Sequence, residues 1–190
     1  MRVERFLFWL SVSLLGWCAI SLTESRLYQA WHKNEFDKTV VQGAGIPMRF
    51  TVPRSRVPDG TAVGRIEIPR IGVSSIIAEG ETDATLRLAV GHIPGTAFPG
   101  DDGNTGLAGH RDTYFRRLAR IRLHDEIRLT ATGGADSLYR VDSITIVDPG
   151  DVSVLESGAV PSVTLVTCYP FHFLGAAPKR FVVRAGRVPS

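Results

Sequence analysis

The segment SVTLVTCYPFHFLGAAPKRFVVRA, residues 162–185, contains two strand patterns separated by a loop. Its first and last seven residues are rich in Val, Thr and Phe, which favour β-strands. We expect these strands to pair antiparallel through the eleven-residue loop 169–179. That pairing would bring Cys168 and Arg180 side by side where the strands meet the loop.

Other short strand patterns lie upstream. The alternating stretch Gly64–Ile68 is interrupted at Pro69, and Thr82–Val90 suits a short helix that begins at a threonine N-cap. A turn-rich stretch, Gly91–Asn104, follows and contains His92. Further strands are predicted for GVSSIIA (72–78), TGLAG (105–109), DEIRLTA (125–131) and SLYRVDSITIV (137–147). Many short strands, with 19 Gly and 11 Pro available for turns, predict a mainly β fold closed as a barrel or stacked as a sandwich.

Near the N-terminus, residues 6–22 form a run of 17 uncharged, mostly apolar residues. At about 1.5 Å per residue, a helix of this length just reaches across the hydrocarbon core of a membrane. No small-x-small cleavage site follows, and Trp17 rather than a small residue precedes Cys18, which argues against a cleaved signal peptide and against a lipoprotein. We expect an uncleaved single-pass anchor with the remaining chain extracytoplasmic, although positive charges on both flanks do not by themselves set this orientation.

These features divide the chain into a membrane anchor (1–22), a helical or extended linker (23–59) and one domain (60–190). The prolines and glycines at 43–60 are typical of a linker. Residues 60–190 contain 14 basic and 14 acidic residues, so the excess positive charge lies in the first 59 residues. A neutral domain lacks the concentrated basic charge of a nucleic-acid binder, and we expect no nucleic-acid partner.

Cys168 is the only cysteine of the domain, since Cys18 lies in the apolar segment. A buried strand cysteine that acts as a small hydrophobe is one interpretation. However, Cys168 ends a strand just before a loop, where reactive groups are usually presented. A thiol nucleophile also needs a base, and among the four histidines of the domain His110 and His92 have the most suitable positions. The pattern therefore makes Cys168 a candidate nucleophile.

Arg180 is a candidate for stabilising the oxyanion that a thiol attack on a carbonyl creates. A guanidinium is permanently charged and donates two hydrogen bonds from a planar fork. An ordinary surface arginine is the alternative interpretation.

Five blocks of the sequence resemble the sortases, which are membrane-anchored cysteine transpeptidases of bacterial surfaces. The blocks are GRIEIPRIGV (64–73), GHIPGTAFPGDDGN (91–104), LAGHRDTYFRRL (107–118), TLVTCYPF (164–171) and APKRFVVRA (177–185). They occur in the order of the family, span about residues 62–188, and resemble class D most. The resemblance implies an eight-stranded closed β-barrel with short helices, preceded by one transmembrane helix.

The resemblance also implies roles for individual residues. Cys168, His110 and Arg180 match the catalytic residues, His92 matches a second histidine that assists, and Thr167 matches the threonine before the nucleophile. The implied reaction begins with attack on the carbonyl after the threonine of an LPxT-like sorting signal in a protein substrate. His110 protonates the leaving amine, while Arg180 and the backbone N–H of Tyr169 stabilise the oxyanion. An amine of the cell envelope or of a pilin then resolves the thioacyl enzyme.

Three other functions are alternatives to the transpeptidase. A thiol hydrolase would use the same acyl enzyme but resolve it with water, and the sequence does not separate it from a transpeptidase. A non-catalytic barrel that binds envelope peptides would leave the thiol without a role. An L,D-transpeptidase would place its cysteine in a Ser-His-Gly-Cys context, which is absent. We predict no cofactor and no metal, because acids of the domain such as Asp101, Asp102, Asp148 and Asp151 show no ligand spacing.

Overall fold

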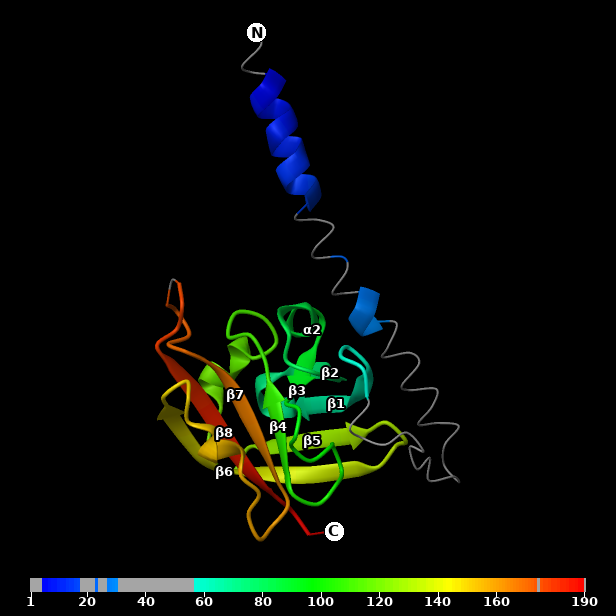
Figure 1. The fold of residues 1–190 in the computed structure, drawn as a ribbon, viewed down its shortest axis with the longest axis vertical. Helices are drawn as coiled ribbons and strands as arrows, with labels where there is room; N and C mark the ends of the chain where they lie inside the picture. The colour runs from blue at the N-terminus through cyan, green and yellow to red at the C-terminus, as the bar shows by residue number, and fades with distance from the viewer. Residues whose placement is uncertain (1–4, 18–22, 24–26, 31–56, 174, 190) are drawn as a thin grey trace.

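A computed structural model describes residues 5–17, 23, 27–30, 57–173 and 175–189. Eight strands close into a barrel in the order β1-β2-β3-β4-β7-β8-β6-β5 (Figure 1), as the resemblance implied. The strands are β1 (Ala62–Ile68), β2 (Val73–Glu79), β3 (Val90–His92), β4 (Asn104–Ala108), β5 (Glu126–Ala131), β6 (Asp136–Val147), β7 (Ser162–Tyr169) and β8 (Lys179–Arg187). The pairs β2–β3 and β4–β7 are parallel, and the other neighbouring pairs are antiparallel.

Short helical segments connect the strands. They are the 3-10 helices η2 (Pro69–Ile71), η3 (Arg116–Arg120) and η4 (Val152–Leu155), and the α-helix α2 (Asp83–Leu88). Thr82 is the N-cap of α2, and its hydroxyl accepts a hydrogen bond of 3.3 Å from the Thr85 N–H, as the sequence predicted. The predicted interruption of the first strand pattern is also confirmed, because η2 begins at Pro69.

The prediction for the segment around His92 was wrong in part. The sequence predicted a helix up to Val90 and turns from Gly91 onward, whereas these two residues and His92 form strand β3. This strand is buried along its whole length, because it pairs with β2 on one side and β4 on the other. Three residues without polar alternation carry too little periodic signal to be recognised as a strand.

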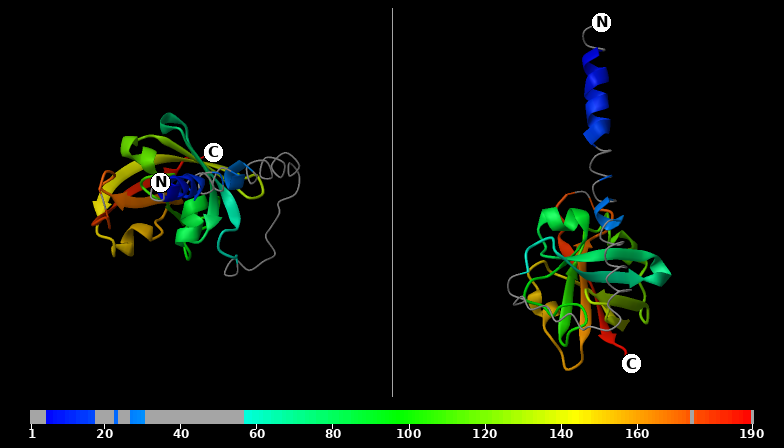
Figure 2. Two further views of the ribbon diagram at one scale, coloured as in Figure 1. Left: turned by 90° about the horizontal axis from the view of Figure 1, so that it is seen from above. Right: turned by 90° about the vertical axis from the view of Figure 1, so that its right-hand side faces the viewer.

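The barrel core is made by one face of each strand. In β7 and β8 the core residues occupy every second position: Val163, Leu165, Val183 and Ala185 are fully buried in it. Side chains alternate between the two faces of a strand, so Cys168 and Arg180 belong to the opposite, outer face. The strands β4, β7 and β8 lie side by side in the barrel wall (Figure 2), and their outer face carries the candidate site.

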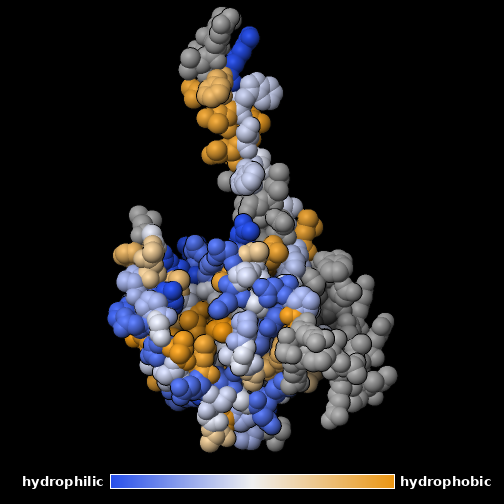
Figure 3. All heavy atoms as spheres, viewed as in Figure 1, coloured by the Kyte–Doolittle hydropathy of each residue, from blue (hydrophilic) through white to orange (hydrophobic). Residues whose placement is uncertain are grey.

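The described part of the predicted anchor is helical. Residues 5–17 form a helix with hydrophobic residues on its surface (Figure 3). Its large apolar side chains, such as Phe6 and Trp17, are exposed. Residues 18–22 of the predicted anchor lie outside the described residues. Among the residues that are described, no helix has both the length and the apolar character needed to cross a membrane.

Several described residues of the predicted linker contact the barrel, and Val57 packs against its core. The Gln29 side chain donates a hydrogen bond of 2.7 Å to the Leu88 carbonyl and accepts one of 3.0 Å from the Ile76 N–H. The Tyr28 hydroxyl donates to the Gly60 carbonyl at 2.9 Å. This turn of chain therefore satisfies backbone groups of the barrel, whereas linker residues 31–56 lie outside the described part of the chain.

Candidate active site

Cys168 and Arg180 are direct cross-strand partners. Strands β7 and β8 pair antiparallel, and the Cα of Cys168 lies opposite the Cα of Arg180. The pairing predicted from residues 162–185 is thus confirmed. Cys168 carries a free, half-buried thiol, and Arg180 is also half-buried. Directly opposed residues point to the same face of a sheet, so the thiol and the guanidinium share the outer face.

His110 reaches the same end of the sheet from strand β4. In the parallel β4–β7 pair, Ala108 lies opposite Val166, and the Gly109 N–H donates a hydrogen bond of 3.2 Å to the Val166 carbonyl. Continuing this register by two residues places His110 at the level of Cys168. His110 is half-buried. Three residues that are far apart in sequence therefore meet at the ends of adjoining strands.

The turn that carries His110, residues 109–115, is fixed by tight packing and is called the histidine turn below. A Cβ atom on Gly109 would lie 2.7 Å from the ring of Phe115, a closer approach than a side chain tolerates. Phe115 is fully buried, and its N–H donates to the His110 carbonyl at 3.2 Å. Because glycine has no side chain, the backbone at Gly109 can pack directly against the Phe115 ring. This packing fixes the orientation of the His110 backbone.

Thr167 and Tyr169, the two sequence neighbours of Cys168, make different kinds of contact. Thr167 is 2% exposed, and its hydroxyl donates a 2.7 Å hydrogen bond to the Gly109 carbonyl. The Tyr169 ring instead joins an aromatic cluster with Phe171 and Phe181, with ring centroids 5.1–6.2 Å apart. Thr167 thus connects β7 to the histidine turn, while the Tyr169 side chain packs at the end of the barrel.

The Arg180 guanidinium is only partly engaged. Its Nη1 donates to the Ala177 carbonyl at 3.4 Å and to the Lys179 carbonyl at 3.2 Å. Its Nε and Nη2 have no hydrogen-bond partner among the described residues. A donor pair with this freedom on the face of the thiol has the chemistry needed to bind an oxyanion.

His92 lies in a buried network of its own. It is fully buried, and its Nδ1 lies 2.7 Å from the Glu79 carboxylate. Its Nε2 lies 3.1 Å from the Ala97 carbonyl and 3.2 Å from the Thr96 hydroxyl, and its ring stacks on Phe98 at 4.5 Å. Neither ring nitrogen is directed to Cys168, His110 or Arg180 by any of these contacts.

The β6–β7 loop, residues 148–161, borders the outer face of β4 and β7. The Arg184 side chain donates to the Glu156 carbonyl at 3.2 Å, and Lys179 forms an exposed 2.7 Å ion pair with Asp148. A Cβ on Gly106 of β4 would lie 3.2 Å from the Leu155 side chain. The sequence did not predict that this loop packs on β8, because only the assembled barrel brings Asp148 to Lys179 and Glu156 to Arg184.

A run of four arginines follows the histidine turn, at positions 116, 117, 120 and 122, and part of this basic run has a structural role. The Arg117 side chain donates to the Gly72 carbonyl at 2.6 Å, and Arg70 donates to the Arg120 carbonyl at 2.6 Å and to the Asp125 carboxylate. The hydrogen bond from Arg70 holds the pKa of the Asp125 carboxyl below its usual range, although burial opposes this effect. Three side chains of the run are exposed without such a partner among the described residues: Arg116, Arg120 and Arg122.

Within the described residues, no group of three or more His, Cys, Asp and Glu side chains is placed to hold a metal ion. The site consists of a thiol, a guanidinium and an imidazole. These three kinds of side chain are the ones that a cysteine acyl-transfer reaction uses as nucleophile, oxyanion donor and acid–base group.

Comparison with known proteins identifies the family. The Sortase domain model matches residues 66–188, and Sortase D of Bacillus subtilis (strain 168) is 37% identical over 130 residues. That alignment covers 68% of this chain and 65% of Sortase D. Sortase SrtE1 of Streptomyces coelicolor is 33% identical over 130 residues, which are 58% of this chain and 37% of the relative. The chain belongs to the sortase family, and it spans less than two thirds of the length of these two curated relatives.

Solved structures agree with this result. A Clostridium perfringens Sortase D5 transpeptidase superposes with a TM-score of 0.68 at 26% identity, covering 88% of this chain and 99% of that one. Clostridium perfringens sortase C, solved with the C-terminal cell wall sorting motif, gives a TM-score of 0.66 at 25% identity and covers 83% and 85%. Sortases of several classes therefore share this barrel.

Proposed function

We propose that the protein is a membrane-anchored cysteine transpeptidase that cleaves an LPxT-like sorting signal after the threonine. The observation that carries the proposal is that Cys168 lies directly opposite Arg180, with His110 at the same level just after the end of the adjoining strand β4. The nucleophile, the oxyanion donor and the acid–base group come from three strands of a rigid barrel. Such a site holds its groups in place before the substrate arrives, which lowers the entropic cost of reaction.

In the first half-reaction, the Cys168 thiolate attacks the carbonyl carbon of the threonine and forms a tetrahedral oxyanion. The free Nε and Nη2 donors of Arg180, together with the backbone N–H of Tyr169, stabilise the negative charge on this oxygen. The C–N bond then breaks, and the His110 imidazolium gives its proton to the leaving amine. The products are a thioester on Cys168, the released C-terminal peptide and a neutral imidazole.

In the second half-reaction, an amine replaces the departed peptide. His110, now neutral, takes a proton from the attacking amine as a new amide bond forms and the Cys168 thiolate leaves. We propose an amine of the cell envelope or of a pilin as the acceptor. The structure of Clostridium perfringens sortase C with the C-terminal cell wall sorting motif supports a protein substrate that carries such a signal.

The remaining residues support this reaction from a distance. We propose that Thr167 fixes the histidine turn and that His92 assists by stabilising the chain around β3, because its ring nitrogens are occupied by Glu79, Thr96 and Ala97. We also propose that residues 6–22 anchor the chain in the cell membrane with domain 60–190 on the extracytoplasmic side, beyond linker 23–59. Substrates that are exported through the membrane would then reach the site directly.

Mass spectrometry of the acyl enzyme tests the proposal. The full chain in detergent micelles is incubated with a library of LPxTx peptides, and we expect an added mass on Cys168 that corresponds to a peptide ending in threonine. The Cys168→Ala variant should fold and gain no mass. An unmodified Cys168 with every peptide would instead support a non-catalytic barrel that binds envelope peptides.

A further inference from the structure

We propose that Arg111 is a positioning residue that holds the histidine turn and the β7–β8 loop in one arrangement. The proposal rests on the catalytic roles proposed above for Cys168, His110 and Arg180. Arg111 directly follows His110 in the sequence, yet its side chain hydrogen-bonds to the loop that follows Cys168. One residue thus connects the acid–base group to the segment that joins the nucleophile and the oxyanion donor.

The connection consists of three hydrogen bonds to backbone carbonyls. Arg111 Nη1 donates to the Pro170 carbonyl at 3.0 Å, and Nη2 donates to the carbonyls of Phe173 at 2.7 Å and Gly175 at 3.0 Å. Gly175 has a φ of +93°, a conformation that favours glycine. Hydrogen bonds from a charged donor are stronger than neutral ones, so this clamp is a substantial part of what holds the loop.

The same loop reaches the oxyanion donor. Its Ala177 carbonyl accepts a 3.4 Å hydrogen bond from Arg180 Nη1. A further attachment of the loop is apolar, because the Phe171 ring packs edge-on against Phe181 at 5.1 Å. Loss of the Arg111 clamp would leave the loop held by this aromatic contact and by the long hydrogen bond from Arg180. The position of Arg180 relative to His110 would then vary, and small misplacements of reacting groups are costly in rate.

The geometry also argues against a substrate-binding role for Arg111. Both terminal nitrogens already donate to carbonyls of the protein, and Nη2 makes two such bonds, which leaves fewer donors for an incoming carboxylate or carbonyl. Arginine suits the clamp because its planar guanidinium donates hydrogen bonds to carbonyls from two nitrogens at once. Lysine offers a single point donor and would keep only part of the arrangement.

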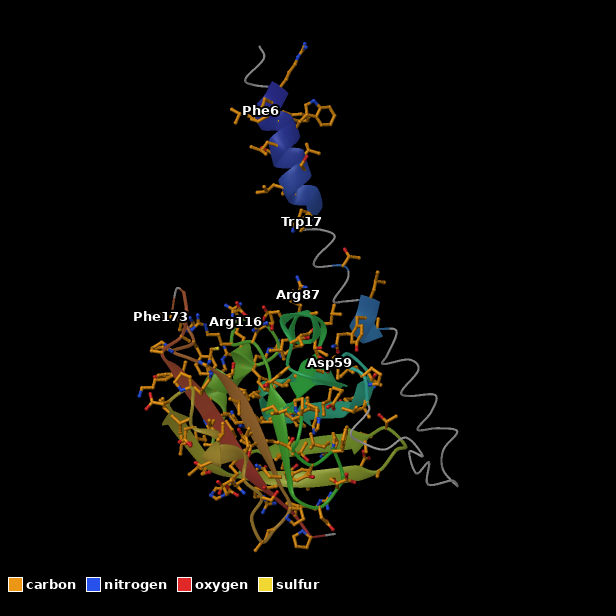
Figure 4. The ribbon with its side chains drawn as sticks, viewed as in Figure 1. Phe6, Trp17, Asp59, Arg87, Arg116 and Phe173 are labelled. Atoms are coloured by element: carbon orange, nitrogen blue, oxygen red, sulfur yellow. The ribbon has the colours of Figure 1, made fainter. Side chains whose placement is uncertain are left out.

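Hydrogen–deuterium exchange tests the clamp without any substrate. The full chain in detergent micelles is compared with Arg111→Ala, Arg111→Lys and Arg116→Ala. Arg116 is the matched control because it loses the same charge from an exposed side chain that points outward from the barrel (Figure 4). We expect exchange in the peptide covering 169–178 to rise roughly tenfold or more for Arg111→Ala and less for Arg111→Lys. It should stay at the wild-type rate for Arg116→Ala, and equal exchange in all four proteins overturns the proposal.

Kinetics with an LPxT peptide provide the second measurement. We expect kcat of Arg111→Ala to fall about 10–100-fold with KM changed by less than about threefold, and Arg111→Lys to recover part of kcat. A raised KM with unchanged kcat would show a binding role and overturn the proposal. If the wild type itself does not turn over the peptide, the proposed function fails, while the exchange measurement still decides whether Arg111 fixes the loop.

Discussion

The hydroxyl of Thr167 donates a 2.7 Å hydrogen bond to the carbonyl of Gly109, across the parallel pair β4–β7. Thr167 directly precedes Cys168, and Gly109 directly precedes His110. The bond therefore links the chain next to the proposed nucleophile to the chain next to the proposed acid–base group. Because Thr167 is buried, water cannot easily replace it as a partner of the Gly109 carbonyl.

Replacing Thr167 with valine should remove this link between the chain at Cys168 and the chain at His110. Valine keeps the shape of threonine but leaves the Gly109 carbonyl without its side-chain partner, at a cost of about 1–3 kcal/mol in the free energy of unfolding. We expect kcat to fall about tenfold or more, because His110 is then positioned less firmly. Urea unfolding and steady-state kinetics measure the two effects. Thr167→Ser retains a hydroxyl and should stay closer to the wild type, so equal losses in both variants would contradict this explanation.

Arg180→Lys should lose most activity although it keeps the positive charge. An ammonium cannot reproduce the two-pronged donation of a guanidinium, and loss of one oxyanion donor typically lowers kcat about 10²–10³-fold. Arg116→Lys serves as the control for the same exchange at an exposed site. Near-normal turnover of Arg180→Lys would contradict this and show that Arg180 contributes only its positive charge.

Much of this site could be predicted from the sequence, because it follows from strand pairing. The strands of residues 162–185 and the length of the loop between them indicate that Cys168 faces Arg180, and the structure confirms it. The role of Arg111 was not predictable in the same way. Its contacts depend on how a turn after β4 packs against a loop after β7, and no local periodicity records such a contact between segments about 60 residues apart.

His92 shows a second limit of prediction from the sequence. The sequence placed it in a turn-rich stretch near the site, whereas it ends a three-residue strand and pairs with the buried Glu79 carboxylate. Tertiary pairing with two neighbouring strands overrides the turn preference of the glycines and prolines around it.

The Arg70–Asp125 pair should make stability depend on pH. The folded-state pKa of Asp125 lies below its usual value, so the stabilisation is present above about pH 4 and is lost as the pH falls through the lower folded-state value. We expect Asp125→Asn to lower the free energy of unfolding by about 1–3 kcal/mol at pH 7, with the difference narrowing below about pH 4. Urea unfolding at both pH values measures this, and a difference that is independent of pH would contradict it.

Removing residues 1–53 should leave a folded, monomeric protein of somewhat lower stability. The two hydrogen bonds of Gln29 to Leu88 and Ile76 are lost, at about 0.5–1.5 kcal/mol each, while the barrel core is retained. Gln29→Ala in the full chain should reproduce the part of the loss that comes from these two bonds, whereas the shortened chain also loses the bond from Tyr28 to Gly60. Size-exclusion chromatography and urea unfolding are the measurements, and aggregation of the shortened chain would show that the N-terminal residues belong to the fold.

The most direct test of the transpeptidase proposal is peptide consumption and product mass, measured with and without an added amine. If water is a poor acceptor, resolution of the Cys168 thioester limits turnover, and hydroxylamine or a peptide with an N-terminal glycine should accelerate it. We predict a higher rate, with product diverted from free acid to hydroxamate or amide, and no turnover in Cys168→Ala. An unchanged rate with free acid as the sole product would contradict the account and leave a thiol hydrolase on a sortase barrel.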